Sequence, residues 1–152
     1  MNTSTVPLNQ VAVSQIAVIT SRFDITKKQL DCFRDLLSSF NKETHSVILG
    51  GDDADYDIFL SLLAQGFKIK IYPRSGNTNG ISKYNGAEVI NTSLPLRDRN
   101  KKMIDDCTIL IGIPQTFNEY EDSPAWKTIR YAMSTEKEVY VISPNGFSWG
   151  LE

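Results

Sequence analysis

Apolar runs and amphipathic segments alternate along almost the whole chain. Residues 11–20 form a β-branched run that ends in polar residues, which predicts a buried strand. From Thr26 onward the apolar residues recur every three to four positions, and Thr26 with Gln29 makes a capping-box pattern. A helix of about four turns is therefore expected to begin there.

The same alternation continues to the end of the sequence. Helices are predicted before Gly66, over residues 96–106, and from Ser123 and Pro124, which suit a cap and a first helical position. Residues 74–84 are rich in Gly, Ser, Asn and Lys without periodicity and are expected to form a loop. Further strands are predicted from short apolar runs at residues 46–49, 67–72, 87–90, 108–113 and 139–143, the last being the final strand.

This order predicts an α/β fold, a Rossmann-like three-layer sandwich with a mostly parallel central sheet. At 152 residues the chain has the length of one domain, so residues 1–152 are expected to form a single unit, with residues 1–10 flexible. Such sheets bind ligands outside the carboxyl ends of their strands, where the strand order reverses. The loops that follow the strands are therefore the places to look for function.

A glycine and aspartate loop follows the second predicted strand. Gly50 and Gly51 would let a backbone approach a ligand closely, although paired glycines equally often form a plain tight turn. Asp52, Asp53 and Asp55 come next, and their charges would repel a bare phosphate. Three uses stay open: Asp53 or Asp55 caps the next helix, a carboxylate accepts from ribose hydroxyls, or Mg²⁺ bridges the carboxylates and a diphosphate.

Basic and aromatic residues near the same edge are candidates for ligand contacts. Arg22 and Arg99 could clamp a phosphate or carboxylate, or form surface ion pairs. The helix that begins at Ser123 would offer free N–H groups to an anion. Trp126, in its first turn, could stack on a base, although packing is the commoner use of such a residue.

Composition and charge exclude several other classes. A net charge of −2 gives no overall attraction for polyanions, so nucleic-acid binding is not expected. Cys32 and Cys107 lie far apart and His45 is the only histidine, which argues against a zinc site or a disulfide framework. No targeting segment or membrane span is recognised, so a cytoplasmic location is expected.

Catalysis, if present, would depend on carboxylates. No histidine or reactive cysteine lies near the strand-end loops, so a nucleophilic triad is not expected. Asp55 and Glu121 are the candidate catalytic residues.

Four segments together resemble the SLOG superfamily, which includes the Lonely-guy phosphoribohydrolases and DNA-processing protein A. They are ITSRFDIT (19–26), LGGDDAD (49–55), RDRNKKMIDDCTILIGIP (97–114) and SPAWKTIRYAMSTEKEVYVISPNG (123–146), in family order. The resemblance implies a nucleotide-related ligand between the glycine loop and the fourth helix. The candidate ligand-binding residues are then Thr20, Ser21, Arg22, Gly50, Gly51, Asp52, Asp53, Asp55, Arg99, Asn100, Pro114, Gln115, Ser123, Trp126 and Thr128.

The chain also departs from that family. Ser123-Pro124-Ala125 stands where members usually carry Gly-Gly-Thr, and Pro124 removes one N–H that would face a phosphate. The Lonely-guy run Pro-Gly-Gly-x-Gly-Thr-x-x-Glu is absent. The leading hypothesis is therefore binding, sensing or sequestration of a nucleotide-derived molecule. An N-glycosidic hydrolase and an interaction module without a ligand are the alternatives, and a homo-oligomer is expected.

Overall fold

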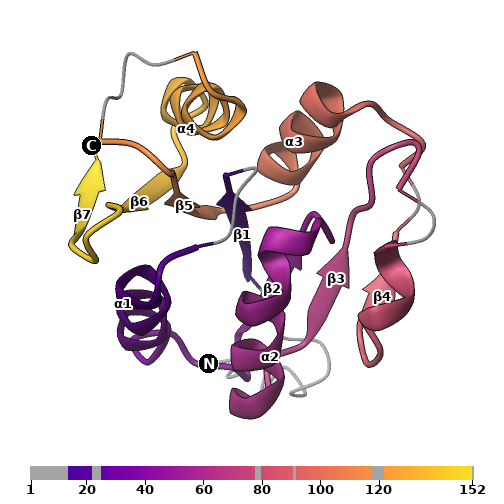
Figure 1. The fold of residues 1–152 in the computed structure, drawn as a ribbon, viewed down its shortest axis with the longest axis horizontal. Helices are drawn as coiled ribbons and strands as arrows, with labels where there is room; N and C mark the ends of the chain where they lie inside the picture. Colours follow the sequence, from indigo (N-terminus) through magenta and orange to yellow (C-terminus); the bar gives the residue numbers. More distant parts are fainter. Residues whose placement is uncertain (1–13, 22–24, 78–79, 91, 118–121, 152) are drawn as a thin grey trace, which may run out of the picture.

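The computed structural model describes residues 14–21, 25–77, 80–90, 92–117 and 122–151 (Figure 1). Strands and helices alternate along this part of the chain, and two short 3₁₀ helices, Asp53–Asp55 and Gly80–Lys83, lie in its loops. The strands are β1 (Ser14–Thr20), β2 (His45–Leu49), β3 (Ile69–Ile71), β4 (Glu88–Val89), β5 (Ile109–Ile113), β6 (Glu138–Ile142) and β7 (Ser148–Leu151). The α-helices are α1 (Lys27–Leu37), α2 (Tyr56–Gln65), α3 (Leu96–Asp105) and α4 (Pro124–Ser134).

All the strands belong to one sheet of order β4-β3-β2-β1-β5-β6-β7. Neighbours from β4 to β6 are parallel, and only β7 is antiparallel to its partner, β6. The predicted α/β, Rossmann-like class is confirmed. Because the chain moves outward from β1 to β4 on one side and from β5 to β7 on the other, the strand order reverses between β1 and β5.

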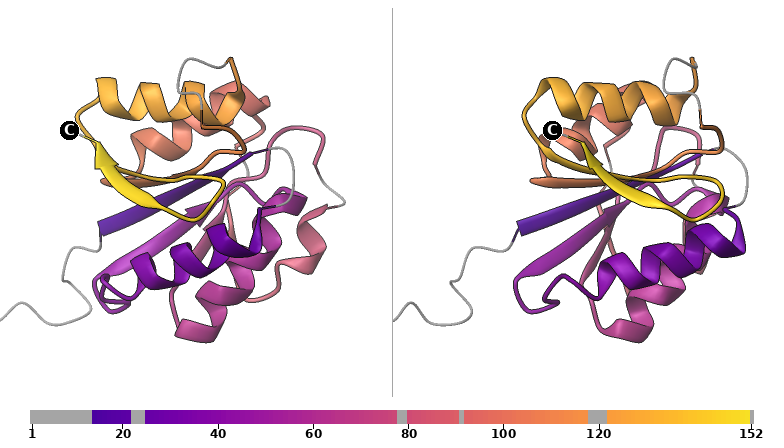
Figure 2. Two further views of the ribbon diagram at one scale, coloured as in Figure 1. Left: turned by 60° about the vertical axis from the view of Figure 1, so that its left-hand side comes forward. Right: turned by 90° about the vertical axis from the view of Figure 1, so that its left-hand side faces the viewer.

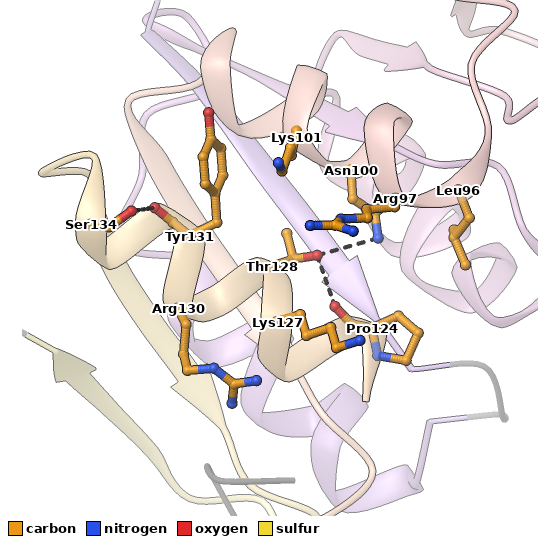
Figure 3. A pocket seen from close by; sticks show the side chains of 10 residues that line it. All are labelled: Leu96, Arg97, Asn100, Lys101, Pro124, Lys127, Thr128, Arg130, Tyr131 and Ser134. Carbon is orange, nitrogen blue, oxygen red and sulfur yellow. Dashed lines mark hydrogen bonds between the residues drawn. The ribbon is translucent and has the colours of Figure 1, made fainter. Parts of the chain in front are cut away.

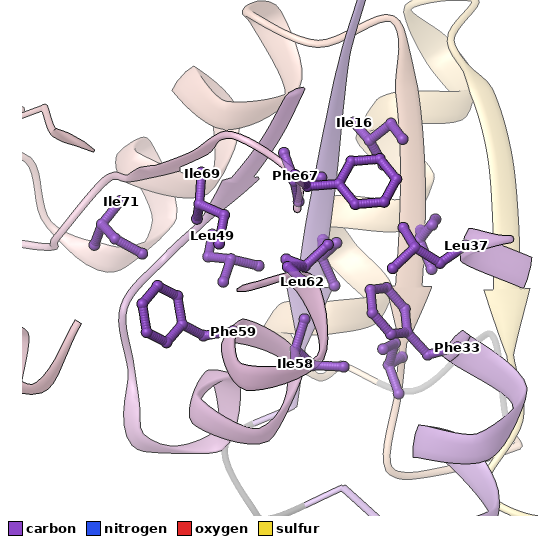
Figure 4. Close-up of a cluster of buried hydrophobic side chains, with 14 of the residues drawn as sticks. Ile16, Phe33, Leu37, Leu49, Ile58, Phe59, Leu62, Phe67, Ile69 and Ile71 are labelled. Atoms are coloured by element: carbon purple, nitrogen blue, oxygen red, sulfur yellow. The ribbon is translucent and has the colours of Figure 1, made fainter. Parts of the chain in front are cut away.

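The sheet separates two helical layers (Figure 2). Alternate strand residues face opposite layers, so Ile16 and Val18 of β1 join the cluster under α1 and α2, whereas Ala17 and Ile19 join the cluster under α3 and α4. Figure 4 shows the first cluster, where Phe33 of α1 packs beside the apolar face of α2. Burial on both faces explains why the central strands are almost continuously apolar.

Several helix ends form as the sequence predicts. Thr26 and Gln29 make a reciprocal capping box at α1, and Gly66 ends α2 with a φ of +83°. Ser123 Oγ accepts a hydrogen bond from the Trp126 N–H at the start of α4, and Pro124 occupies its first position.

The expectation that residues 139–143 form the final strand was wrong. After β6 a tight turn, with Gly146 at a φ of +86°, reverses the chain into β7. The Ser143 N–H donates to the Phe147 carbonyl at 2.8 Å and closes this turn. A four-residue strand with a glycine in it carries too short a pattern to be recognised.

Smaller differences concern lengths. Helix α1 is 11 residues, about three turns, and the predicted loop 74–84 contains the 3₁₀ helix Gly80–Lys83. Residues 11–13 of the first predicted strand, and residues 1–10, lie outside the described residues. Across the described ranges, none of the helices combines the length and the apolar character that crossing a membrane requires.

Gly112 in β5 is required by the packing of α4 on the sheet. A Cβ there would lie 2.7 Å from Cδ1 of the buried Ile129. Gly112→Ala should therefore lower the free energy of unfolding by about 1–3 kcal/mol, measured by urea denaturation.

Gly150→Ala in β7 is the matched control, because its nearest contact would be 3.8 Å away at Tyr140 Cε1. This variant should change the unfolding free energy by less than about 0.5 kcal/mol. Equal destabilisation of the two variants would contradict the packing argument.

Candidate functional site

The carboxyl ends of the parallel strands bring the predicted site loops to one edge of the sheet. Thr20 ends β1 and Ser21 follows it, Gly50 and Gly51 follow β2, and Pro114 begins the loop after β5. Two candidates, Arg22 and Glu121, lie outside the described residues.

Arg99 is buried, with only 2% of its surface exposed, and its guanidinium makes several hydrogen bonds within the protein. Its Nη1 donates to the carbonyls of Gly50 and Tyr72, at 2.8 and 2.9 Å. Its Nη2 donates to Asp52 Oδ2 at 2.8 Å, and its Nε donates to Asn100 Oδ1 at 2.9 Å. The guanidinium predicted to meet a ligand anion or a surface carboxylate is instead directed into the protein.

Gly50 and Gly51 are both packed closely against side chains of the protein itself. A Cβ at Gly50 would lie 2.7 Å from Arg99 Nη1, so the close approach expected of a ligand is made here by the arginine. Gly51 has a φ of +78°, and a Cβ there would lie 2.5 Å from Ile71 Cγ2. Substitution of either glycine would disturb the fold before it reported on a ligand.

Each of the three aspartates has a partner in the protein. Asp52 also accepts from Arg74 Nε at 3.2 Å, and Asp53 pairs with Lys83 at 2.7 Å. The hydrogen bond and charge of Lys83 hold the pKa of Asp53 below its usual value. Among the described residues no group of three or more His, Cys, Asp or Glu could hold a metal ion, and the carboxylates considered for Mg²⁺ already have partners in the protein.

Asp55 is buried, with 2% of its surface exposed, and it joins two strand-end loops. Its Oδ1 accepts from Thr20 Oγ1 at 2.7 Å, and its Oδ2 accepts from the Asp52 N–H at 3.1 Å. Burial raises its pKa to about 6. Asp55 is the N-cap residue of α2, as one of the open uses has it, but its side chain makes no cap hydrogen bond to α2 and instead accepts from the Asp52 N–H before the 3₁₀ helix Asp53–Asp55.

Trp126 packs in the core, which is the commoner of the two uses that the sequence left open. It is 2% exposed within the cluster under α4, and its Nε1 donates to the Thr116 carbonyl at 3.2 Å. The ring therefore packs in the core rather than facing the edge. Asn100 and Thr128 are also buried, and the Asn100 amide donates to Thr128 Oγ1 at 3.3 Å.

The remaining candidate residues lie where the strand order reverses, at the carboxyl ends of β1 and β5. Pro114 is buried and its carbonyl accepts from Gln29 Nε2 at 2.8 Å, whereas Gln115 is exposed. Thr116 Oγ1 is buried without a hydrogen-bond partner among the residues that the structure describes. This atom, beside the start of α4, is the strongest sign of an unfilled polar position at the edge.

Sequence reasoning missed the residues of the 74–84 loop that hold the aspartates. Besides Arg74 and Lys83, the Tyr84 hydroxyl donates to the Asp52 carbonyl. The signal in the sequence was weak, because residues 74–84 contain a single arginine and a single lysine and are separated from the acidic loop by α2 and β3.

No family model and no curated protein matches the sequence. Solved structures do match its fold, among them the two that follow. The structure of TM1055 has a TM-score of 0.60 at 14% identity, over 84% of this chain and 72% of that chain. DNA processing protein A from Streptococcus pneumoniae has a TM-score of 0.66 at 16% identity, over 86% of this chain and 50% of that chain.

The chain shares their fold. The expected similarity to DNA processing protein A is confirmed for the fold, and at these low identities it carries no further. The chain also spans half the length of DNA processing protein A.

Removal of the Arg99 side chain should strongly destabilise the fold. Arg99→Ala leaves two buried carbonyls without their donor and removes one cationic partner of Asp52. We expect the free energy of unfolding to fall by about 3–5 kcal/mol. Arg97→Ala, the same change on the exposed side of α3, should cost less than about 0.5 kcal/mol in the same urea titration.

Asp55 should make stability fall between about pH 4 and pH 6. Its pKa rises from 3.8 to about 6 on folding, so the folded state binds the proton more tightly. The contribution is complete below pH 4 and is lost as the pH rises through 6, by up to about 3 kcal/mol. Asp55→Asn, whose amide can still pair with Thr20 and the Asp52 N–H, should lack this loss.

The measurement is the difference in unfolding free energy between wild type and variant from pH 4 to pH 7. Asp53→Asn is the control, because the pKa of Asp53 is lowered and its contribution is lost as the pH falls. Parallel pH profiles for wild type and Asp55→Asn would show that the carboxyl is not buried as described.

Proposed function

We propose that this protein binds a nucleotide or a nucleotide-derived small molecule at the crevice outside the carboxyl ends of β1 and β5. The observation that carries the proposal is the reversal of strand order between these two strands. In open parallel sheets, the loops at such a reversal separate to opposite faces and leave room for a ligand.

The start of α4 adds to this crevice. Its first-turn N–H groups and its dipole favour an anionic group, even though Pro124 supplies no N–H. Asp122, next to Ser123, is paired with Lys127 at 3.1 Å, which offsets its charge. These features support a ligand with a phosphate or another anionic group.

Neutral polar groups complete the surroundings. Thr20 and Gln115 lie at the ends of the two central strands, and the buried Thr116 Oγ1 lacks a partner among the described residues. Of these, the exposed Gln115 amide is open to a ligand, and its donor and acceptor suit the hydroxyls of a sugar or the edge of a base. The fold shared with DNA processing protein A and TM1055 is compatible with this location.

The geometry favours binding over turnover by Asp55. Both carboxylate oxygens are engaged within the protein, and the side chain is almost wholly covered. A general acid or base must reach the reacting group, and Asp55 as placed does not. We therefore propose binding, sensing or sequestration rather than N-glycosidic hydrolysis by this carboxyl.

Thermal unfolding in the presence of AMP, cyclic AMP, NAD and ADP-ribose tests the proposal. A ligand at about 100 times its Kd should stabilise the protein by about 2.7 kcal/mol. Gln115→Glu places a negative charge at the crevice and should weaken binding of that ligand about tenfold or more.

Asn85→Asp is the matched control, because it makes the same change in charge at an exposed position. Its neighbour Gly86 shares a cavity with Ser46 and Lys68, at the amino ends of β2 and β3 and so at the opposite edge. No stabilisation by any of the four compounds, or equal loss of affinity in the two variants, would refute the proposal.

A further inference from the structure

A cavity lies between α3 and α4 (Figure 3). Its volume is about 560 Å³, within the range of sites that hold small molecules. The first turns of both helices contribute to it, through Leu96 and Arg97 on α3 and Pro124 and Lys127 on α4. We call this cavity the α3–α4 groove.

The groove is lined by cations from both helices and by no Asp or Glu among the described residues. Arg97 reaches from α3 toward Thr128 on α4, and within the described chain it has no hydrogen bond or ion pair. Lys101 lies 5.5 Å from the ring centre of Tyr131. Arg130 also lines the groove, although its side chain points away from α3.

Two of these cations, Arg97 and Lys101, form no ion pair with a carboxylate among the described residues. Asp122 pairs with Lys127 at 3.1 Å, but both side chains are largely exposed, which makes such a pair weak. Asp105 accepts from the Tyr131 hydroxyl at 2.6 Å rather than from a groove cation. A protein with a net charge of −2 thus concentrates unneutralised positive charge at one place.

The walls between these cations are apolar. Leu96, Pro124 and the Tyr131 ring present carbon surface, and the stems of the long basic side chains extend it. The floor is polar at one point, where the Asn100 amide and the Thr128 hydroxyl pair with each other. The groove therefore combines an apolar body with a cationic rim.

A second copy of the chain is a poor occupant. A two-fold interface places the same surface against itself, so Arg97, Lys101 and Lys127 would approach their own copies. Like charges in contact cost free energy, and no lining carboxylate offsets them. Charge complementarity requires an anionic occupant.

We propose that the α3–α4 groove binds a small phosphorylated molecule with a flat, apolar body. The phosphate pairs with Arg97 and Lys127 beside the first turns of the two helices, and the body lies against Leu96, Pro124 and Tyr131. The groove shares the first turn of α4 with the proposed strand-end site, but the rest of its lining comes from α3 and from later turns of α4, so the inference does not rest on the proposed function.

The probe is 1-naphthyl phosphate, titrated into ¹⁵N-labelled protein and followed by amide chemical shifts. The largest shifts are expected in α3 and α4, with an affinity about tenfold or more above that for inorganic phosphate and for 1-naphthol. Arg97→Glu should reduce the affinity about tenfold or more, whereas Arg97→Lys should retain most of it.

Lys27→Glu is the control, since it makes the same charge change at an exposed position on α1, on the other face of the sheet. Shifts centred on Thr20 and Gln115 would mean that the probe occupies the strand-end crevice, and this would overturn the groove proposal while supporting the proposed function. Equal affinity for inorganic phosphate, absence of binding, or equal losses in the two Glu variants would also overturn it.

Discussion

A buried guanidinium organises the carboxyl edge of this sheet. Arg99 comes from α3, yet it joins the end of β2, the residue after β3 and the acidic loop through hydrogen bonds to Gly50, Tyr72 and Asp52. A buried cation without such partners would be far too costly, so these groups must remain in place around it. The absence of a side chain at Gly50 and the position of Asp52 follow from this requirement.

The acidic loop is stable for the same reason. Three aspartates within four residues would repel one another if they were left in water alone. Each has a different solution: Asp52 meets two arginines, Asp53 meets a lysine, and Asp55 is buried against a hydroxyl and a backbone N–H. The loop that resembles a phosphate or metal site is therefore satisfied from within the protein.

The sequence allowed the layers of the fold to be predicted, because periodicity directly reflects which faces are buried. The capping box at Thr26 and the αL glycine at position 66 were also recognisable, since their chemistry is local. The direction of Arg99 was not, because Gly-Gly followed by Asp reads the same whether an arginine of the protein or a ligand approaches it. Strand β7 was missed because four residues carry little pattern, and the use of Trp126 stayed open because a first-turn tryptophan suits either core or ligand.

The place of β1 in the sheet has a consequence for how the chain folds. β1 is the first described strand, yet it lies between β2 and β5, and Ile16 pairs with Ile109 across most of the sequence. The turn after β6 likewise meets the start of α1, where Thr26 Oγ1 donates to the Pro144 carbonyl at 3.0 Å. Contacts between such distant segments slow folding, because a large loop must close before they form. During synthesis β1 must wait for its second neighbour, so this pairing forms only after residues 109–113 have been made.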